Sequence, residues 1–256
     1  MFVSELRTRR VACLSGHGAS VSDLHRNAVL ATFDSDRFDR LLPHIQVDFS
    51  PIGHVAQRAG TPLSHIHFPL DSVYSVLAES EHGAAIEVGT VGSEGLVGIA
   101  GHLGARNSRQ TVICWCAGDT AYVPVAEFLR ATTEGGPWHA AIDRFTDYLL
   151  IQTAQNVLCI SQHSVRARLA RWLLAAHDRY DCQQFSSTQE SLSQMLGVQR
   201  PTISDTAARM QREGLITYRR GNIEIVDRAG LRQIACECYR VVDQALTAVR
   251  DAGRPN

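Results

Sequence analysis

The feature that most constrains this chain is a change of pattern at Gly135-Gly136-Pro137. Between Gln46 and Pro124 the apolar residues form short runs that glycines and prolines interrupt, as in HIHFPLDSVYSVLAES and RQTVICWCAGDTAYVP. Short strands at this spacing are typical of an antiparallel sandwich or barrel rather than of a parallel sheet. After Pro137 the apolar residues recur at helical spacing. The sequence therefore predicts an α+β protein, with a β domain first and helices after it.

Composition excludes several classes of protein. The chain has 256 residues and no run of about 18 apolar residues, so we expect no membrane partner and no membrane span. The first 20 residues lack the apolar stretch of a secretory signal, and we therefore expect a cytoplasmic protein. The seven cysteines are an odd, scattered set, unlike a disulfide framework.

The helical part opens with a heptad pattern. Its positions step by four and three from Trp138 to Cys159, and the inner ones are Ile142, Phe145, Leu149, Gln152 and Asn156. We expect these five residues to form a parallel two-helix dimer seam, because buried amides at seam positions can fix the register and the two-stranded state. The alternative is a helix that packs on its own β domain.

The stretch STQESLSQMLGVQRPTISDTAARMQREGLI, residues 187–216, predicts two short helices. Ser187 and Glu190 have the spacing of a capping box, and Gly197 suits the left-handed position that ends a helix. Pro201 fits the first turn of the second helix. LITYRRGNIEIV then predicts a hairpin that turns at Arg220-Gly221-Asn222, and Asp227 should cap a last helix that runs to about Arg250.

Three short helices followed by a two-stranded wing make a winged helix-turn-helix. The charge distribution agrees: residues 1–160 carry 11 arginines and 16 carboxylates, whereas residues 161–256 carry 14 arginines and 10 carboxylates. A basic C-terminal third suits contact with phosphates. Two packed helices of an ordinary α domain remain the alternative for residues 187–216.

The stretch TQESLSQMLGVQRPTISDTAARMQREGLITYRRGNIEIVD resembles the DNA-binding domain of the Crp/Fnr family of bacterial transcription regulators. HIHFPLDSVYSVLAES and GAAIEVGTVGSEGLVG are similar to the β-roll effector domain of that family, and ARWLLAAHDR and DRAGLRQIACECY resemble a divergent Crp-like subgroup. The resemblance covers roughly residues 27–242. It implies a cyclic-nucleotide-binding-like β-roll, which is a double-stranded β-helix, joined by a long dimerisation helix to a winged helix-turn-helix.

We expect four parts from this resemblance: an N-terminal extension (1–26), an effector-sensing β-roll (27–136), a dimerisation helix (137–163), and a DNA-binding domain with a C-terminal helix (164–256). The resemblance also implies the partners. These are double-stranded DNA with a two-fold related site, a second copy of the chain in a homodimer, and RNA polymerase if the protein is an activator.

The residues expected to touch DNA lie at the start of the two helices and on the wing. Arg200 falls where the family places an arginine that reads guanine, but Pro201 and Asp205 depart from the family pattern, so the family's usual half-site is not carried over. Asp205 could accept from cytosine, face solvent or pair with Arg209. The full set is Thr188, Gln189, Gln199, Arg200, Thr202, Ser204, Asp205, Arg209, Arg219 and Arg220.

The residues of the candidate effector pocket depart from the family pattern. Family members that bind cyclic nucleotides use a Gly-Glu pair for the ribose and an Arg-Ser/Thr pair for the phosphate. Here Glu94-Gly95 has the reverse order, and Thr111 stands where the phosphate arginine belongs. We therefore expect no response to cyclic AMP. The candidate pocket residues are Glu94, Gly95, Arg109, Thr111, Gln152 and Asn156.

We expect no cofactor and no metal site, with the effector unidentified. Cys114-x-Cys116 and Cys236-x-Cys238 lack the Cys-x-x-Cys spacing of zinc sites, and we interpret them as packed thiols, the second pair on a helix. A redox or metal sensor that uses Cys114 and Cys116, or His65 and His67, is an alternative.

The rival class is an enzyme, a metal-dependent cupin whose ligands would be His65, His67, Asp71 and His102. That hypothesis leaves the winged C-terminal third unexplained, and we expect a protein that is not an enzyme.

Overall fold

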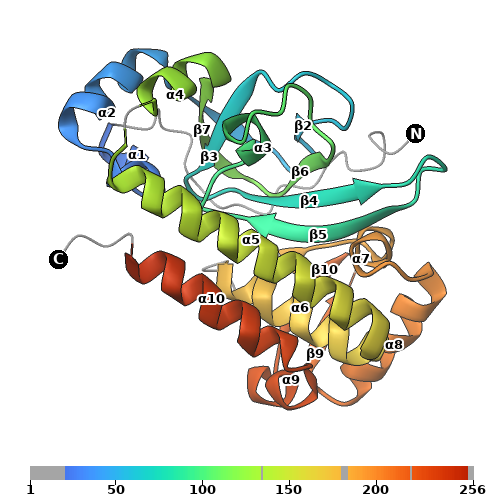
Figure 1. Ribbon diagram of the computed structural model, residues 1–256. Coiled ribbons are helices and arrows are strands. Elements are labelled where there is room, and N and C mark those ends of the chain that lie inside the picture. Colours follow the sequence, from blue (N-terminus) through green and yellow to red (C-terminus); the bar gives the residue numbers. More distant parts are fainter. Residues whose placement is uncertain (1–20, 134, 180–183, 220, 253–256) are drawn as a thin grey trace. The chain divides into compact units, whose positions relative to one another are not determined.

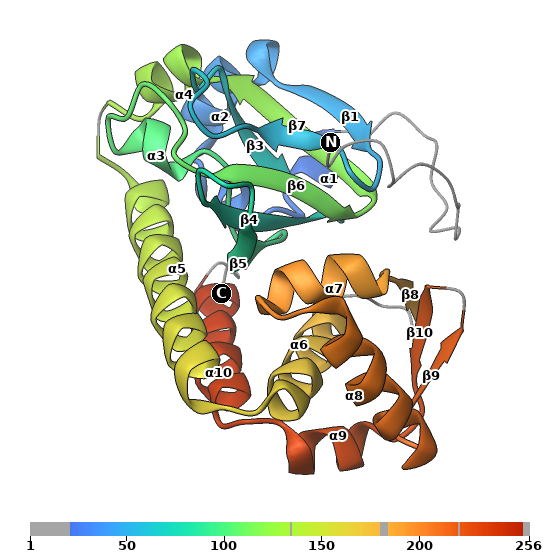
Figure 2. The same cartoon turned by 90° about the vertical axis from the view of Figure 1, so that its right-hand side faces the viewer.

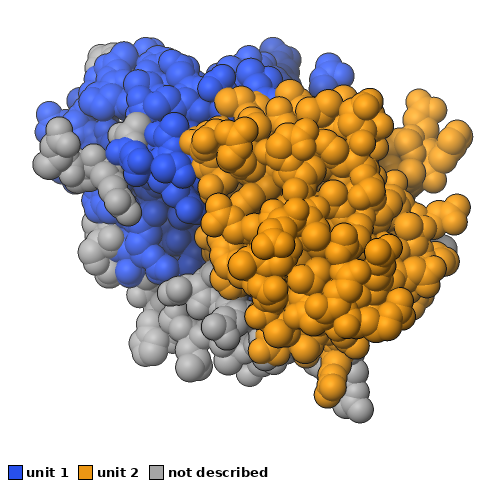
Figure 3. Space-filling model, turned by 90° about the horizontal axis from the view of Figure 1, so that it is seen from below, with its two compact units in different colours: residues 1–79, 89–150, 246–256 blue, residues 80–88, 151–245 orange. Residues whose placement is uncertain are grey.

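The computed structural model describes residues 21–133, 135–179, 184–219 and 221–252. These residues form two compact units, which Figure 3 shows in different colours. The first unit takes the described parts of 1–79, 89–150 and 246–256, and the second takes 80–88 and the described parts of 151–245. No helix in these described ranges has the length and hydropathy to cross a membrane.

Two antiparallel sheets build the first unit, as Figure 1 shows. One sheet has the order β1-β7-β3, and the other has the order β2-β6-β4-β5. Ile66, Phe68 and Tyr74 are fully buried, and the Tyr74 hydroxyl donates to Ser50 Oγ at 2.7 Å. The strand bounds are β1 (Gln46–Ser50), β2 (Val55–Gln57), β3 (His65–Pro69), β4 (Val73–Glu79), β5 (Ala85–Val91), β6 (Thr111–Cys116) and β7 (Gly118–Pro124).

Short helices cover the end of this sheet pair. α4 (Val125–Ala131) contacts β3 and β7, and α2 (Ser35–Leu41) packs against α4. Asp34 caps α2 by accepting from Arg37 N at 3.0 Å, because an aspartate carboxylate can satisfy a free N–H of a first helical turn. The remaining short elements are α1 (Val21–Leu24), η1 (Leu30–Thr32), η2 (Leu42–His44) and α3 (Ile99–His102).

One long helix, α5 (Pro137–Gln162), follows. It begins at the predicted proline, whose missing N–H costs nothing in a first turn. The boundary between the two units falls within this helix, after Leu150. The predicted boundaries at 26, 136 and 163 stay predictions.

The second unit contains the predicted winged helix-turn-helix. In Figure 2, α6 (Val165–Arg179), α7 (Gln189–Leu196) and α8 (Arg200–Arg212) form the helical part, and β9 (Ile216–Arg219) and β10 (Asn222–Ile225) form the wing. The α+β fold with a β domain, a long helix and a winged helix-turn-helix is thus confirmed.

Two details of the prediction are wrong. The wing sheet has three strands, in the order β8-β10-β9, because β8 (Gln184–Ser186) pairs with β10. The last helix is two helices, α9 (Arg228–Ile234) and α10 (Cys238–Ala252). The helix breaks at Ala235, whose extended backbone (φ −67°, ψ 146°) ends α9.

Candidate DNA-binding site

The first helix of the motif is capped one residue later than the sequence predicts. Thr188, not Ser187, is the N-cap of α7, and its side chain accepts from Ser191 N at 3.0 Å. The Ser187 side chain is buried, and its carbonyl accepts from the Tyr218 hydroxyl at 2.8 Å. The predicted capping box between Ser187 and Glu190 is therefore wrong. Ser187 instead lies before the helix, where its carbonyl bonds the wing residue Tyr218.

A tight turn joins α7 to α8. Gly197 ends α7 with φ +60°, the left-handed conformation that favours glycine. Leu192, Ile203 and Met210 are fully buried and pack the two helices together. Pro201 lies in the first turn of α8, as predicted. The apolar residues of α8 thus lie on one buried face, and the opposite face is exposed to solvent.

That other face carries four of the ten predicted contact residues. Arg200 and Thr202 are exposed on the first turn, and Asp205 and Arg209 are exposed further along the same helix. Gln199, the N-cap residue, is exposed as well. The N-terminal turns of a recognition helix are those that reach base edges in a major groove. The exposed polar residues of α8 therefore have the placement that DNA reading needs.

Two predicted contact residues also hold the helices to each other. The Ser204 hydroxyl donates to Gln189 Oε1, and both side chains are partly buried. This bond joins the first turn of α7 to the second turn of α8. Gln189 and Ser204 therefore position the exposed residues, whatever else they contact.

Arg209 has a partner within its own unit. Its Nε donates to Glu213 Oε1 at 3.0 Å, and Arg166 donates to the other oxygen of the same carboxylate. These bonds, that from Arg166 first, lower the pKa of Glu213 below its usual range. The suggested Asp205–Arg209 pair is thus replaced by Glu213, which lies four residues after Arg209 on the same helix face.

The wing carries one described arginine. Arg219 ends β9 and is exposed, whereas Arg220 lies outside the described residues. Tyr218, next to it, donates its hydroxyl to Ser187, and burial raises the pKa of Tyr218 to about 12. Tyr218 and Glu213 were not among the predicted residues. An aromatic residue on a short wing strand does indicate a side chain that packs against the domain.

Comparison with known proteins agrees with this geometry. Residues 167–234 match the family model of the Crp-like helix-turn-helix domain. The second unit contains a Crp-like helix-turn-helix domain. The predicted resemblance to the Crp/Fnr family is confirmed by this match together with the solved structures that share the fold.

Three of those structures cover most of both chains. The c-di-GMP-responsive global regulator CLP of Xanthomonas campestris is 17% identical, with a TM-score of 0.64 over 76% of this chain and 100% of its own. FixK2 of Bradyrhizobium japonicum is 11% identical, with a TM-score of 0.65 over 75% and 98%. A Crp/Fnr-family transcriptional regulator of Thermus thermophilus is 18% identical, with a TM-score of 0.60 over 74% and 98%. At these identities the likeness establishes the fold. No curated protein matches the chain by sequence.

In the first unit, the predicted effector residues are engaged in packing or internal hydrogen bonds, or face solvent. Glu94 is 1% exposed and accepts from Gly92 N at 3.0 Å, and its other oxygen lies 3.9 Å from Arg250 Nη2. Thr111 donates to Glu79 Oε2 at 2.6 Å. Arg109 is exposed. A hollow of about 280 Å³ lies in the same unit, in the segment from Val55 to His65, and its lining contains none of the six candidate effector residues.

The predicted seam residues are buried within the chain itself. Ile142 and Phe145 belong to the first unit, where the Phe145 ring fills the space beside Gly95. In the second unit, Gln152 is 5% exposed, and Asn156 accepts from Arg171 Nη2 at 2.7 Å. Only Leu149, among the five, is half-buried. The burial therefore favours the alternative in which this face of α5 packs on its own chain.

The β3 histidines and the β6 cysteines have contacts within the first unit. The His65 and His67 rings lie 5.4 and 5.9 Å from the Tyr122 ring, and burial lowers the pKa of His67 to about 4. Burial raises the pKa of Cys114, whose thiol donates to Cys116 O at 3.0 Å. A thiol in such a site is unreactive.

The proposed cupin ligands also have other contacts. Asp71 pairs with Arg26 at 3.3 Å, and the His102 ring lies 5.8 Å from the Phe128 ring. Among the described residues, the group that could hold a metal ion contains none of the four predicted cupin ligands. It consists instead of Cys159, His163, Cys236 and Cys238, which the sequence analysis did not bring together.

Proposed function

We propose that this protein is a sequence-specific DNA-binding transcriptional regulator that acts as a homodimer. The observation that carries the proposal is the division of α8 into a buried apolar face and an exposed polar face that begins at Arg200. The matched Crp-like helix-turn-helix domain supports it. RNA polymerase would be a further partner if the regulator activates transcription.

The exposed residues divide into two roles. Arg200, on the first turn of α8, would read a base edge, because its guanidinium can bond guanine O6 and N7 together. Thr202 and Asp205 would lie beside it in the groove. Arg219 on the wing and Thr188 at the start of α7 would contact phosphates, which fixes position but carries no sequence information.

Gel-shift titrations of three variants test these roles. Arg200→Ala should lower the preference for the cognate site over unrelated DNA by about 1–3 kcal/mol. Arg219→Ala should weaken binding to both DNAs alike and reduce the salt dependence by about one phosphate contact. Arg232→Ala, an exposed arginine on α9, serves as the control and should change neither. Equal losses for Arg200→Ala and Arg219→Ala would show that the roles are not separate.

For the homodimer we propose a surface of α5 other than the predicted seam. α5 exposes Leu150 and Val157, each 65% exposed and seven residues apart, and Ile160, which is 40% exposed. This spacing puts the three on one stripe of the helix, which suits a two-helix contact. An exposed apolar stripe rarely stays in water without a partner. We place the dimer contact on this stripe.

Sedimentation of the purified chain tests the contact. Val157→Glu should shift the protein from dimer to monomer, because a buried charge would face its own copy in the partner. Leu103→Glu changes an equally exposed leucine, 68% exposed and far from α5 in sequence, and should leave the dimer intact. A Val157→Glu protein that stays dimeric would place the interface elsewhere.

We also propose that cyclic AMP is not the effector. A cyclic phosphate needs a fixed positive charge. Thr111 stands at the matching position, and it is bonded to Glu79. DNA binding measured with and without cyclic AMP should therefore be the same, and a change of affinity would contradict this.

A further inference from the structure

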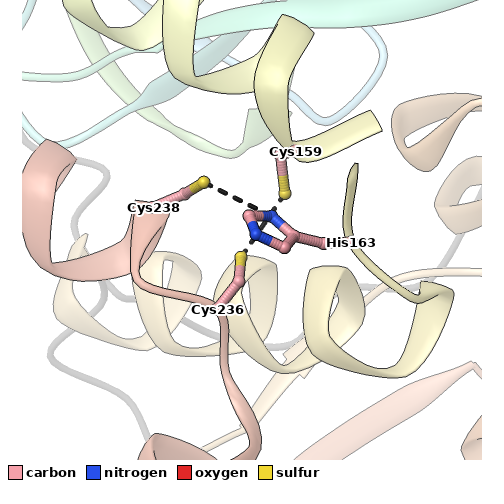
Figure 4. A group of neighbouring side chains, drawn as sticks. All are labelled: Cys159, His163, Cys236 and Cys238. Carbon is pink, nitrogen blue, oxygen red and sulfur yellow. Dashed lines mark hydrogen bonds between the residues drawn. The ribbon is translucent and has the colours of Figure 1, made fainter. Parts of the chain in front are cut away.

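Two pairs of side chains from distant parts of the sequence lie close together in the second unit. Cys159 lies near the end of α5 and His163 just after it, while Cys236 lies in the link between α9 and α10, and Cys238 is the first residue of α10 (Figure 4). Each offers one ligand atom, and the four atoms all lie within 4.8 Å of one another. The three cysteines are at most 7% exposed. The break at Ala235 brings Cys236 to Cys159, which a continuous helix would not do.

The distances fit a small tetrahedral ion. Zinc binds sulfur at about 2.3 Å and histidine nitrogen at about 2.0–2.1 Å. Tetrahedral angles then separate two sulfurs by about 3.8 Å and a sulfur and a nitrogen by about 3.6 Å. The Sγ atoms of Cys159 and Cys236 are 3.5 Å apart, and Cys238 Sγ is 3.6 Å from His163 Nδ1. Little movement is needed to place an ion between them.

The histidine is oriented as a ligand would be. While Nδ1 lies 3.6 Å from Cys238 Sγ, Nε2 lies 3.2 Å from Glu237 Oε1. A carboxylate that accepts from the far ring nitrogen fixes the tautomer with a free lone pair on the near nitrogen, and this arrangement recurs around metal-bound histidines. Because Glu237 stands between two of the cysteines, one short segment supplies both the ligands and the orienting group.

Positive charge surrounds the thiols. The Arg171 guanidinium acts on Cys159, Cys236 and Cys238 in the direction that stabilises their thiolates. Arg168, 5% exposed, acts on Cys159 and Cys236 in the same sense. Three thiolates around a divalent cation leave one net negative charge, which these arginines can balance.

We propose that Cys159, His163, Cys236 and Cys238 bind one zinc ion. The ligand set is Cys₃His, which is typical of closed structural zinc sites. On binding, the three thiols release their protons to solvent and His163 binds through its neutral Nδ1, so no electron transfer is involved. The ion would tie the end of α5 to the link between α9 and α10, on the two sides of the Crp-like domain in sequence.

Elemental analysis of the full chain, purified without chelator, tests the site. We expect about one zinc per chain. Cys236→Ser and Cys238→Ser should lower the content at least tenfold, whereas Cys114→Ser, at a buried cysteine of β6, should not lower it. His163→Cys should keep the metal and His163→Ala should lose it. Glu237→Gln should weaken the affinity by about tenfold or more.

A second measurement does not depend on the folding of any variant. The wild-type chain, stripped with a chelator and titrated with Co²⁺, should show the visible bands of tetrahedral cobalt and thiolate-to-cobalt charge transfer. Zinc should then abolish these bands. Metal-free protein without a cobalt spectrum would overturn the proposal. So would iron with acid-labile sulfide after anaerobic purification, or a Cys159–Cys236 disulfide in metal-free protein. DNA binding is not the readout, so this test can fail independently of the proposed function.

Discussion

In the first unit, the polar side chains of Glu94, Thr111 and Cys114 are buried, whereas in the second unit the polar face of α8 is exposed. These three side chains are hydrogen-bonded to other residues of the first unit. Arg200 and Asp205, by contrast, lie on the open face of α8. Buried polar groups that are satisfied hold a fold in one state, whereas exposed ones are free to meet a partner. Substitutions should therefore affect stability most in the first unit and recognition most in the second.

The largest expected effect is at Gly95 in the first unit. A Cβ at this position would lie 1.9 Å from the Phe145 ring, so Gly95→Ala must displace a fully buried aromatic side chain. We expect a loss of about 3 kcal/mol in the free energy of unfolding, measured by urea denaturation. Gly135→Ala, with open space around its Cβ, should be close to neutral.

Phe145→Leu in the Gly95→Ala background should recover part of the loss, because the smaller side chain makes room for the methyl group. If Gly95→Ala were as stable as the wild type, the close packing of Phe145 on Gly95 would be refuted.

The next expected effect is a dependence of the free energy of unfolding on pH, which His67 causes. Burial, with the nearby His65 and His54, lowers its pKa from 6.5 to about 4. The folded state therefore favours the neutral ring, and the resulting stability is present above pH 6.5 and lost as the pH falls toward 4. The loss at pH 4 should reach about 3 kcal/mol. His67→Gln should remove this part of the acid sensitivity.

Urea denaturation at several pH values measures this loss of stability. His82→Gln, at an exposed histidine, is the control. Equal acid sensitivity in the wild type and His67→Gln would show that His67 is not the responsible group.

The smallest effect concerns the second unit. Thr188→Ala removes the cap of α7 and should cost about 1 kcal/mol of stability. Thr202→Ala, at an exposed threonine in the first turn of α8, should cost less, although it can still alter DNA binding. Thermal unfolding of the two variants checks this order. The reverse order would mean that the α7 cap is not used.

The helices, the wing and the order of the parts followed from local signals that a sequence carries. Gly197 and Pro201 predict the ends of helices by their own backbone preferences. The heptad pattern of α5 did not show what the helix packs against, because a helix packed on its own chain and a helix packed on a second copy show the same period. Only the structure shows that Ile142 and Phe145 are already covered.

The cysteine cluster lay outside what spacing can predict. Cys159 and Cys236 are 77 residues apart, and their contact depends on how α5, α6 and α9 pack. A Cys-x-Cys motif was also placed on a helix that the structure breaks before Cys238. The effector residues stay a prediction for a similar reason: the sequence shows that Glu94 is present, but not that it is buried.

The strand β8 has one more consequence. Gln184 pairs with Glu224, so the two ends of the segment that contains α7, α8 and the wing lie side by side. The pairing of β8 with β10 thus closes the segment that carries α7, α8 and the wing at its base, as a strand pair closes a loop.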